Sequence, residues 1–516
     1  MGASAAHPLY VAAVLLPLLA LAPVWVLGRL GIAPAIAATV LPAALPWTAA
    51  GALMAAAGVA LAYLASPVLV DHVEAQILAL GWIVAEGGRA WHGPEAAERT
   101  ALLYGPLVYR LIGTTLAVAD GALWAAKLPG VAGMAAFLAL TYAAARRLAS
   151  RADALALTGA AAAFALTLGA SAFWIRPDPM IAAAAAMPLP FLLGRRGIAA
   201  ALITGAALAI AVGFKAHGWL YLLPALALLA RDGVRPVGLA LGLGTLGALL
   251  PFLDPTMPLD DYATWLGAAT THGIDSVHFS ATAQLGLFLA LGALPALARS
   301  GNLERRIFAL ALGAALLGAV LVGGKAGAGP HHLLPLVPGV AVAAAWSRPE
   351  TASGMGRWRL ALFGWMLAIG LIAAATVRGD IAVPLARGEA VGAIHAEIDG
   401  FLSRPGIGLV ELGYGNRGAS VERYRLVLAG MPYTLDAAAL MDMQRSGLPL
   451  PPATLDSIAR CATPTWLIPA GQEPFRLESF YPGGGDLFGP ELRALFLARY
   501  ERIEILRFYD VWRCRS

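Results

Sequence analysis

Long apolar runs recur along the first 377 residues, and a short arginine cluster lies at every second boundary between them. A run of about 17–25 apolar residues is long enough to cross a bilayer as a helix. Hydrophobic residues make up 59% of the chain and charged residues only 13%, whereas ordinary soluble domains carry roughly a quarter charged residues. The pattern predicts a polytopic α-helical membrane protein with about 11–13 transmembrane helices.

Charged or proline-containing turns bound each expected span. The first run has no basic leading segment, so we expect a retained helix and not a cleaved signal peptide. The second run contains prolines and fits either a kinked span or part of a hairpin. The expected spans are Leu9–Leu27, Gly31–Leu45, Trp47–Ser66, Leu128–Ala145, Ala154–Phe173, Met180–Gly194, Ile198–Phe214, Trp219–Ala230, Val237–Leu253, Leu285–Ala298, Ile307–Val322, Leu333–Trp346 and Leu360–Val377.

Arginine clusters follow alternate spans from Arg146 to Arg359. Such clusters mark the cytoplasmic side of membrane proteins. The opposite, external side then receives a long first loop (residues 71–127), a polar loop (Asp254–Gln284) and everything after about residue 378. The net charge of +5 reflects these arginine clusters and does not indicate nucleic-acid binding.

The chain divides into two expected domains. Residues 1–378 form the transmembrane domain, whose first loop carries amphipathic helices that lie in the membrane interface. Residues 379–516 have frequent charges and shorter apolar runs, which predicts a small external α/β domain. Its expected strands are Gly408–Leu412, Arg425–Leu428 and Trp466–Ile468, and its expected helices are Ala390–Leu402 and Pro490–Tyr500.

The chain has two cysteines, Cys461 and Cys514, and both lie in the tail. Neither has a metal-ligand partner at a useful spacing. A disulfide between them fits an external tail, and two buried free thiols are the open alternative.

Ionisable residues gather at the external ends of the spans. A charged group at the membrane boundary is costly unless it meets water, a partner or a substrate. Cations on the external side are also exceptions to the positive-inside rule, and an anionic ligand such as a lipid phosphate would explain them. The residues concerned are Asp71, Glu74, Arg176, Asp178, Lys215, His217, Lys325, His331 and His332.

Each of these residues also has a purely structural explanation. Asp71 fits an ordinary helix-end aspartate, and Asp178 can pair with Arg176 at a helix start. Lys215 can extend to the interface, and the glycines around Lys325 fit a plain turn. The histidines show no metal-ligand spacing. Their joint placement on one side, each at the end of a span, favours a functional role.

The chain resembles the C-type (GT-C) superfamily of membrane glycosyltransferases, especially bacterial relatives of protein O-mannosyltransferases and of the lipid A aminoarabinose transferase. The resemblance rests on Asp71 with Glu74, on Tyr104-Gly105-Pro106-Leu107, on Arg176-Pro177-Asp178-Pro179 and on the glycine-rich segment around Lys325. The family often has adjacent Asp and Glu residues in the first loop. Here His72 follows Asp71 and the acid comes at Glu74, whose role is open; Glu74 is a candidate catalytic residue along with Asp71 and Asp178.

The resemblance implies an inverting enzyme that moves a sugar from a polyprenyl-phosphate donor to a glycan, lipid or protein acceptor. The site would face the periplasm at the inner membrane of a bacterium. Asp71 would be the general base, and Asp178 would orient the acceptor, a basic residue or a divalent metal such as Mg²⁺ or Mn²⁺. The expected donor-phosphate ligands are Arg176, Lys215, Lys325, His331 and His332, and Tyr104 and Tyr109 would belong to the substrate loop.

The alternative is a transporter or flippase for a lipid-linked sugar. Transporters are typically built from inverted repeats and bind their substrates near the membrane midplane. The sequence shows no such repeat, and its ionisable residues lie at the ends of spans, which favours the enzyme.

Overall fold

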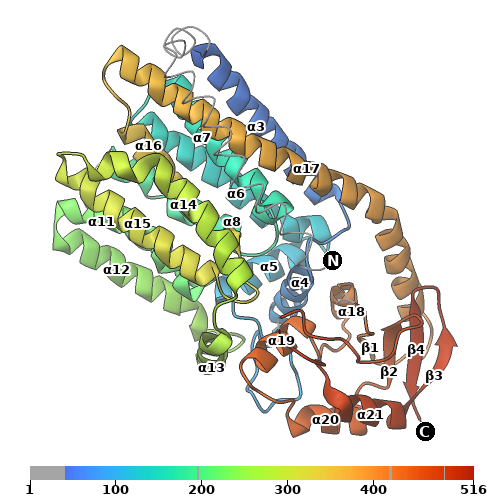
Figure 1. Cartoon of the computed structure of the whole chain (residues 1–516). Helices are drawn as coiled ribbons and strands as arrows, with labels where there is room; N and C mark the ends of the chain where they lie inside the picture. Colours follow the sequence, from blue (N-terminus) through green and yellow to red (C-terminus); the bar gives the residue numbers. More distant parts are fainter. Residues whose placement is uncertain (1–40, 195–196, 418–420, 482, 516) are drawn as a thin grey trace. The chain divides into compact units, whose positions relative to one another are not determined.

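The computed structural model describes residues 41–194, 197–417, 421–481 and 483–515, and Figure 1 shows the arrangement of the elements. Apolar helices occupy the first three quarters of this part, and a small mixed sheet follows near the end of the chain. The predicted helical, multi-span membrane protein with a small C-terminal α/β domain is confirmed. The predicted span Leu9–Leu27 and most of Gly31–Leu45 lie outside the described residues. Among the described residues, the helices long and apolar enough to cross a membrane are Ala43–Ala65, Leu123–Arg146, Val234–Leu253, Leu303–Gly323 and Gly354–Leu402.

The chain divides into two compact units. The bundle unit comprises the described residues up to Ala65 and those of Gly130–Ala248 and Ile274–Val383. The loop-and-tail unit comprises Ser66–Pro129, Leu249–Gly273 and Pro384–Ser516. The predicted boundary between residues 378 and 379 lies inside one unbroken helix, α17 (Ala352–Leu402).

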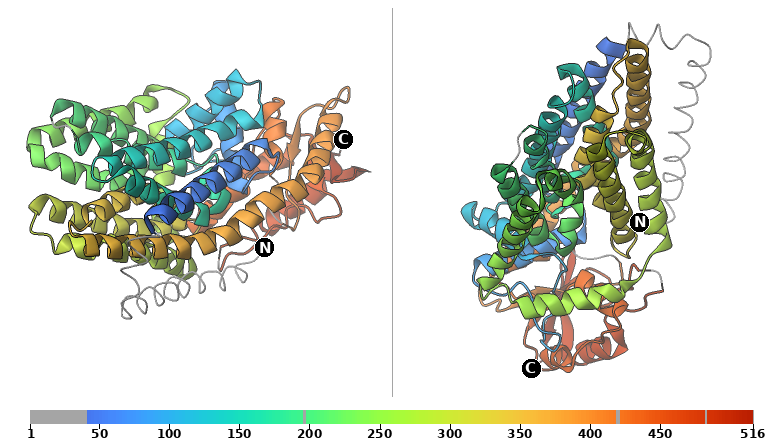
Figure 2. Two further views of the ribbon diagram at one scale, coloured as in Figure 1. Left: turned by 90° about the horizontal axis from the view of Figure 1, so that it is seen from above. Right: turned by 90° about the vertical axis from the view of Figure 1, so that its left-hand side faces the viewer.

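Alanine-rich helices form the bundle unit. A buried cluster of Leu45, Ala49, Ala156, Ala160 and Met366 joins three of them, which lie side by side in Figure 2. Small side chains at such contacts let apolar helices approach closely. The three are α3 (Leu41–Ala65), α7 (Arg151–Thr167) and α17. The others are α6 (Leu123–Arg146), α8 (Asp178–Ala186), α9 (Leu189–Leu192), α10 (Ile198–Phe214), α11 (Leu223–Leu229), α12 (Val234–Leu249), α14 (Ser276–Ala298), α15 (Leu303–Gly323) and α16 (Val337–Trp346).

Several predicted spans are partly 3₁₀-helical. The segments η2 (Ala216–Leu222) and η6 (Pro330–Leu336) precede α11 and α16. Gly218 makes the first possible, because a Cβ atom there would lie 2.1 Å from the Ala211 carbonyl oxygen. A further segment, η1 (Gly169–Ala172), follows α7 and begins at Gly169, whose φ is +64°. These interruptions carry or flank most of the ionisable residues that the sequence singled out.

The predicted polar loop Asp254–Gln284 is largely wrong. It contains α13 (Leu259–Ala269), and α14 begins at Ser276 inside it. Asp275 starts α14 as its N-cap, since its carboxylate accepts hydrogen bonds from the backbone N–H groups of Val277 and His278. The polar residues in this stretch are therefore helix-start signals as well as loop signals.

The loop-and-tail unit contains a four-stranded sheet in the order β1-β2-β4-β3. The pair β1–β2 is parallel, and the other neighbouring pairs are antiparallel. Its core includes Val410, Leu467 and Val511. The strands are β1 (Val410–Leu412), β2 (Thr465–Pro469), β3 (Tyr500–Ile505) and β4 (Tyr509–Cys514), and the helices are α4 (His72–Ala85), α5 (Pro106–Val118), α13, α18 (Arg423–Leu428), α19 (Ala437–Arg445), α20 (Pro452–Ala459) and α21 (Gly489–Arg499).

The predicted strands at β1 and β2 and the predicted helix Pro490–Tyr500 are confirmed. The predicted strand Arg425–Leu428 is wrong, because this segment is α18. A short apolar run can be a buried strand or one helical turn, and its pattern alone does not distinguish them. The predicted helix Ala390–Leu402 is the last part of α17.

Hydrogen bonds join the first loop to the tail within the loop-and-tail unit. The Arg99 N–H donates to the Thr434 carbonyl oxygen (2.6 Å), and the Asp436 N–H donates to the Arg99 carbonyl oxygen (2.9 Å). The Thr454 hydroxyl donates to the Ala97 carbonyl oxygen (2.9 Å). Segments more than 300 residues apart therefore form one structure.

Cys461 and Cys514 form a disulfide, which decides between the two alternatives left by the sequence. The bond closes a loop with a sequence separation of 53 residues. We expect replacement of both cysteines by serine to lower the stability of the loop-and-tail unit by about 2–4 kcal/mol. Thermal unfolding with and without reductant checks this, and reductant should not change the unfolding of the serine variant. Equal stability of the wild type and the serine variant without reductant would contradict the expectation.

Candidate active site

A buried ion pair lies where two helices of the bundle unit end. Asp178 is the first residue of α8, and Lys215 follows the last residue of α10. Lys215 Nζ donates to Asp178 Oδ1 over 2.6 Å, and both side chains are at most 4% exposed. Charges this deeply buried need partners, and the position of Asp178 at a helix N-terminus adds to its stabilisation.

Histidines from η2 and η6 extend this pair. His331 Nε2 lies 4.0 Å from Asp178 Oδ1, and His332 Nδ1 lies 2.8 Å from the Tyr221 hydroxyl oxygen. The ring centroids of His217 and His332 are 5.1 Å apart. The two 3₁₀ segments thus bring together three imidazoles that are distant in the sequence.

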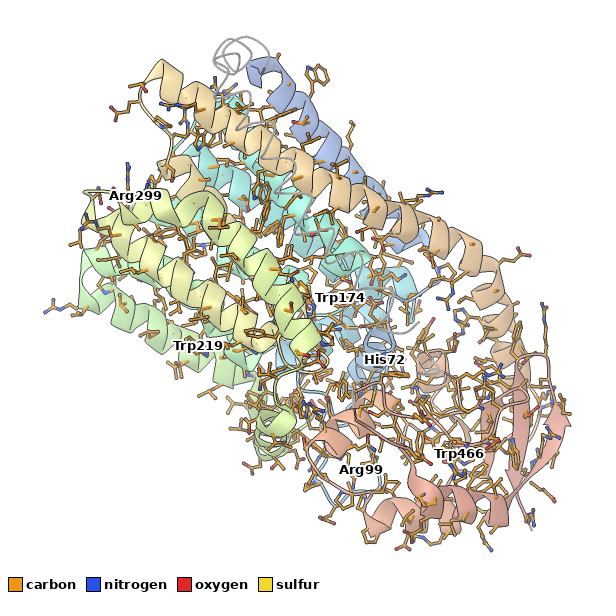
Figure 3. All side chains as sticks on the ribbon, in the orientation of Figure 1. His72, Arg99, Trp174, Trp219, Arg299 and Trp466 are labelled. Carbon is orange, nitrogen blue, oxygen red and sulfur yellow. A yellow bond between two sulfur atoms is a disulfide. The ribbon has the colours of Figure 1, made fainter. Side chains whose placement is uncertain are left out.

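Trp174 and Arg176 complete the group. The Arg176 guanidinium carbon lies 4.0 Å from the centre of the Trp174 ring, a cation–π contact. The edge of the same ring contacts His331 at a centroid distance of 5.4 Å; Figure 3 labels Trp174. We call this group the buried cluster, and its members are Trp174, Arg176, Asp178, Lys215, His217, Tyr221, His331 and His332.

The buried cluster has unused hydrogen-bonding capacity. Asp178 Oδ2, His217 Nε2 and His331 Nε2 are buried and have no hydrogen-bond partner among the described residues. Native proteins rarely leave such atoms unsatisfied, and each exception calls for an explanation such as a bound ligand or water. Two cations, Arg176 and Lys215, face one carboxylate, so the cluster carries net positive charge. A ligand that suits it is anionic and accepts hydrogen bonds.

Lys325 adds a further cation near this group. Its side chain is half-buried and lies within electrostatic range of His217. A backbone bridge to Ile274 and a hydrogen bond from the Asp275 N–H to the Gly324 carbonyl oxygen (2.8 Å) hold its segment. The residues of the bundle unit that were predicted to bind phosphate therefore lie near one another, although they are far apart in the sequence.

Sequence reasoning missed Tyr221 as a member of the cluster. Tyr221 lies four residues after His217, and this spacing next to an unexpected Lys-x-His was the signal that could have found it. Sequence reasoning also missed Lys127, a buried cation on α6. Its ammonium group donates to the carbonyl oxygens of Ser66 (2.7 Å) and Val68 (3.0 Å).

Asp71 belongs to the loop-and-tail unit, where it is the N-cap of α4. Its Oδ1 atom accepts the Glu74 N–H at 2.9 Å, and the Glu74 carboxylate accepts the Val70 N–H. Asp71 thus caps the first turn of α4, and Glu74 bonds the residue before the cap. Asp71 is half-exposed, whereas Glu74 is fully buried and within electrostatic range of Lys127. Glu74 therefore lies inside the turn that precedes α4, and Asp71 begins the helix with a partly exposed side chain.

The two tyrosines predicted for a substrate loop differ in environment. Tyr109 is fully buried, its hydroxyl donates to the Leu102 carbonyl oxygen (3.4 Å), and its ring contacts Trp91. Tyr104 is half-buried and lies just before α5. Tyr109 is thus a core residue of the loop-and-tail unit.

The first loop also contains a histidine whose charge state affects stability. His92 Nε2 accepts the backbone N–H groups of Thr100 (3.0 Å) and Ala101 (3.3 Å). Burial lowers the pKa of His92 below its ordinary value of 6.5, and the nearby Arg99 lowers it further. The folded state therefore prefers the neutral ring, and its advantage is present above pH 6.5 and is lost as the pH falls toward the folded pKa.

We expect the melting temperature of the wild type to fall between pH 7.5 and pH 5. His92→Gln should be less stable than the wild type at pH 7.5, because it changes the hydrogen bonds to Thr100 and Ala101. Its melting temperature should fall less than that of the wild type on acidification. Melting curves at both pH values check this. Parallel losses in the two proteins would show that His92 does not carry the pH dependence.

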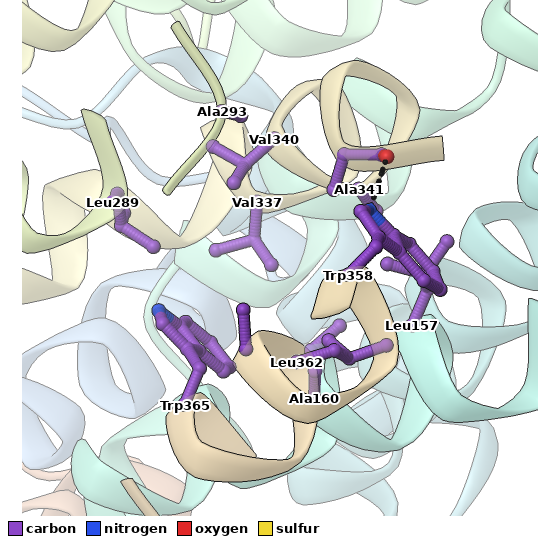
Figure 4. Close-up of a pocket in the computed structure, with 13 residues that line it drawn as sticks. Leu157, Ala160, Leu289, Ala293, Val337, Val340, Ala341, Trp358, Leu362 and Trp365 are labelled. Atoms are coloured by element: carbon purple, nitrogen blue, oxygen red, sulfur yellow. Dashed lines mark hydrogen bonds between the residues drawn. The ribbon is translucent and has the colours of Figure 1, made fainter. Parts of the chain in front are cut away.

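An apolar cavity of about 120 Å³ lies between α7, α14, α16 and α17 (Figure 4). Its lining includes Leu289, Val337, Trp358 and Trp365, and the Trp358 indole N–H donates to the Ala344 carbonyl oxygen (3.1 Å). No ionisable side chain lines this cavity. The buried cluster, and not this cavity, therefore has the side chains for acid–base or charge-stabilising chemistry.

The sequence left open a divalent metal at Asp71 and Asp178, and the described residues show how well they could hold one. Among them, no three His, Cys, Asp or Glu side chains group closely enough to hold a metal ion. Asp71 and Asp178 belong to different units. Lys215 already occupies one oxygen of Asp178, so the residues do not offer a ready coordination site.

Comparison with known proteins gives matches among solved structures. No family model and no curated protein matches the chain. The crystal structure of ArnT from Cupriavidus metallidurans bound to undecaprenyl phosphate matches with a TM-score of 0.57 at 14% identity, over 90% of this chain and 97% of that chain. The apo structure of the same protein gives 0.54 at 13%, over 89% and 96%. At this identity the likeness establishes the fold, and this chain has an ArnT-like fold.

Proposed function

We propose that this protein is an inverting glycosyltransferase that moves a sugar from a polyprenyl-phosphate donor to an acceptor at the periplasmic face of a bacterial inner membrane. The observation that carries the proposal is the buried, net positive cluster within a fold whose solved example binds undecaprenyl phosphate. A polyprenyl phosphate has the anionic, hydrogen-bond-accepting headgroup that such a cluster suits.

In the proposed reaction, Asp71 takes the proton of an acceptor hydroxyl. The hydroxyl oxygen attacks the anomeric carbon of the donor, and the bond between that carbon and the phosphate oxygen breaks with inversion. A general base contributes about 10²–10⁴-fold to such a step. The partly exposed carboxylate suits this role, because the hydrogen bond from the Glu74 N–H and the start of α4 fix its position.

The leaving polyprenyl phosphate gains negative charge as the bond breaks. Cations and hydrogen-bond donors that are already in place stabilise such charge without reorganisation. We assign this role to Arg176, Lys215 and Lys325, with His331 and His332 as additional donors. Asp178 holds Lys215 in position through their 2.6 Å contact.

The orientation is part of the proposal. Arginine clusters predict which ends of the spans face the cytoplasm, and the disulfide of the tail fits an oxidising compartment such as the periplasm. The active site and the tail would then share the periplasmic side.

Reconstitution in liposomes distinguishes the enzyme from a flippase for a lipid-linked sugar. The donor, a polyprenyl phosphate with a radiolabelled sugar, is placed in both leaflets together with a membrane extract as the acceptor pool. The enzyme is expected to move label from the donor to new lipid or glycan products. Label that stays on the donor while the donor changes leaflet faster than in protein-free liposomes would support the flippase and overturn our proposal.

A further inference from the structure

A hollow of about 450 Å³ lies within the loop-and-tail unit, and its lining contains none of the residues assigned above. This volume is in the range of small-molecule sites, about 300–1,000 Å³. Three segments supply its wall: the end of the 249–273 segment, the last turn of α19 and a glycine-rich stretch before α21. The lining residues are Thr271, His272, Gly273, Gln444, Arg445, Ser479, Tyr481, Gly483, Gly484 and Gly485.

Hydrogen bonds fix the polar wall of this hollow. His272 is buried, and its Nε2 atom lies 3.1 Å from both the Asp442 carbonyl oxygen and the Ser446 hydroxyl oxygen. The Tyr481 hydroxyl donates to Asp442 Oδ1 (3.0 Å). The Ser446 hydroxyl is also 3.0 Å from the Ala268 carbonyl oxygen. Groups fixed before a ligand arrives lose little entropy on binding, which favours affinity.

Arg445 gives the hollow its charge. Its Nε atom donates to the His272 carbonyl oxygen (2.7 Å), which fixes the guanidinium plane at the wall. A guanidinium binds phosphate or carboxylate groups through paired hydrogen bonds. Arg445 also occupies the last turn of α19, where the helix dipole favours a cation and helps to hold it in place.

The remaining side chains suit sugar hydroxyls. Gln444 offers an amide, Thr271 and Ser479 offer hydroxyls, and Tyr481 offers a phenol beside an aromatic face. Such groups both donate and accept hydrogen bonds, as sugar hydroxyls do. From these contacts we infer that the hollow is a binding site for an anionic saccharide, a sugar that carries a phosphate or carboxylate. Its assignment as the acceptor site rests on the proposed function; the binding itself does not.

Binding to the purified full-length protein tests this inference by calorimetry. The probes are maltose 1-phosphate, maltose and inorganic phosphate. We expect maltose 1-phosphate to bind at least about 10-fold more tightly than either of the others, because it alone engages both Arg445 and the hydroxyl-binding groups. Arg445→Gln should weaken its binding at least about 10-fold.

A second variant guards against misfolding of the first. Gly485 lines the hollow, and a Cβ atom there would meet no protein atom within 4 Å, so Gly485→Phe should leave the fold intact and weaken the binding of maltose 1-phosphate. The matched control is Arg425→Gln in α18, which removes a surface guanidinium that pairs with Asp399. Melting temperatures verify folding, and the control should bind as the wild type does.

The inference is overturned if maltose 1-phosphate does not bind, if it binds no better than maltose, or if Arg425→Gln weakens binding as much as Arg445→Gln. Because the readout is binding, it is independent of sugar transfer. Transfer without binding at this hollow would overturn the inference and leave the proposed function intact. Binding at this hollow without any sugar transfer would support the inference and overturn the proposed function.

Discussion

Replacing Asp71 by asparagine should lower the rate of sugar transfer by at least about 100-fold, because the proposed general base is lost. Asparagine caps a helix about as well as aspartate does, so the hydrogen bond from the Glu74 N–H to residue 71 can persist. The fold should therefore survive while the chemistry fails. Initial rates of transfer in membranes with matched protein levels measure the effect.

Asp120→Asn is the matched control for this variant. Asp120 lies in the same segment of the loop-and-tail unit, is exposed, and has a φ of +49°, a conformation that asparagine tolerates well. The Asp120→Asn variant should transfer sugar at the wild-type rate. If Asp71→Asn also keeps that rate, Asp71 is not the base.

Asp178→Ala should destabilise the bundle unit by about 3–5 kcal/mol. The substitution leaves the Lys215 ammonium group buried without the carboxylate that lies 2.6 Å away, and breaking a buried pair from one side costs roughly this much. Unfolding by titration with a denaturing detergent measures the loss. The matched control is Glu304→Ala, which removes a more exposed ion pair with Arg231 and should cost about 1 kcal/mol or less.

The double variant Asp178→Asn/Lys215→Met separates structure from function. Replacing both members of a buried ion pair with uncharged groups of similar size is often nearly neutral for stability. We therefore expect it to regain most of the stability that Asp178→Ala loses. Its transfer should remain impaired, because one of the cations assigned to the donor phosphate is gone. Full transfer by this variant would remove the pair from the proposed mechanism.

The sequence predicted the membrane class and many of the helices because apolar length and charge alternation are local signals. The span Ile198–Phe214 coincides with α10 residue for residue. The 3₁₀ starts of the spans at Ala216 and Pro330 were not predicted, because they depend on close contacts such as that of Gly218 with Ala211. Those contacts are tertiary, and no periodicity records them.

In the candidate site, too, the single residues could be predicted from the sequence but their contacts could not. Asp178, Lys215 and His331 stood out individually, since charge at the end of a span is unusual in any context. Their meeting at 2.6 and 4.0 Å depends on how three helix ends converge, and the sequence does not encode that in a local pattern. The pairing of the first loop with the tail through Arg99 was likewise not predicted, because it joins segments more than 300 residues apart. That Asp71 and Asp178 act in one site remains a prediction.

The most direct test of the central claim follows the label in a single reaction. Purified protein in lipid nanodiscs is given a polyprenyl phosphate that carries a radiolabelled sugar, with a membrane extract as the acceptor pool, and the products are separated by chromatography. The proposal predicts that the wild type moves label to a new product and releases unlabelled polyprenyl phosphate, and that Asp71→Asn at equal folded amounts does neither. Label that stays on the donor with the wild type, or equal transfer by the two proteins, would contradict it.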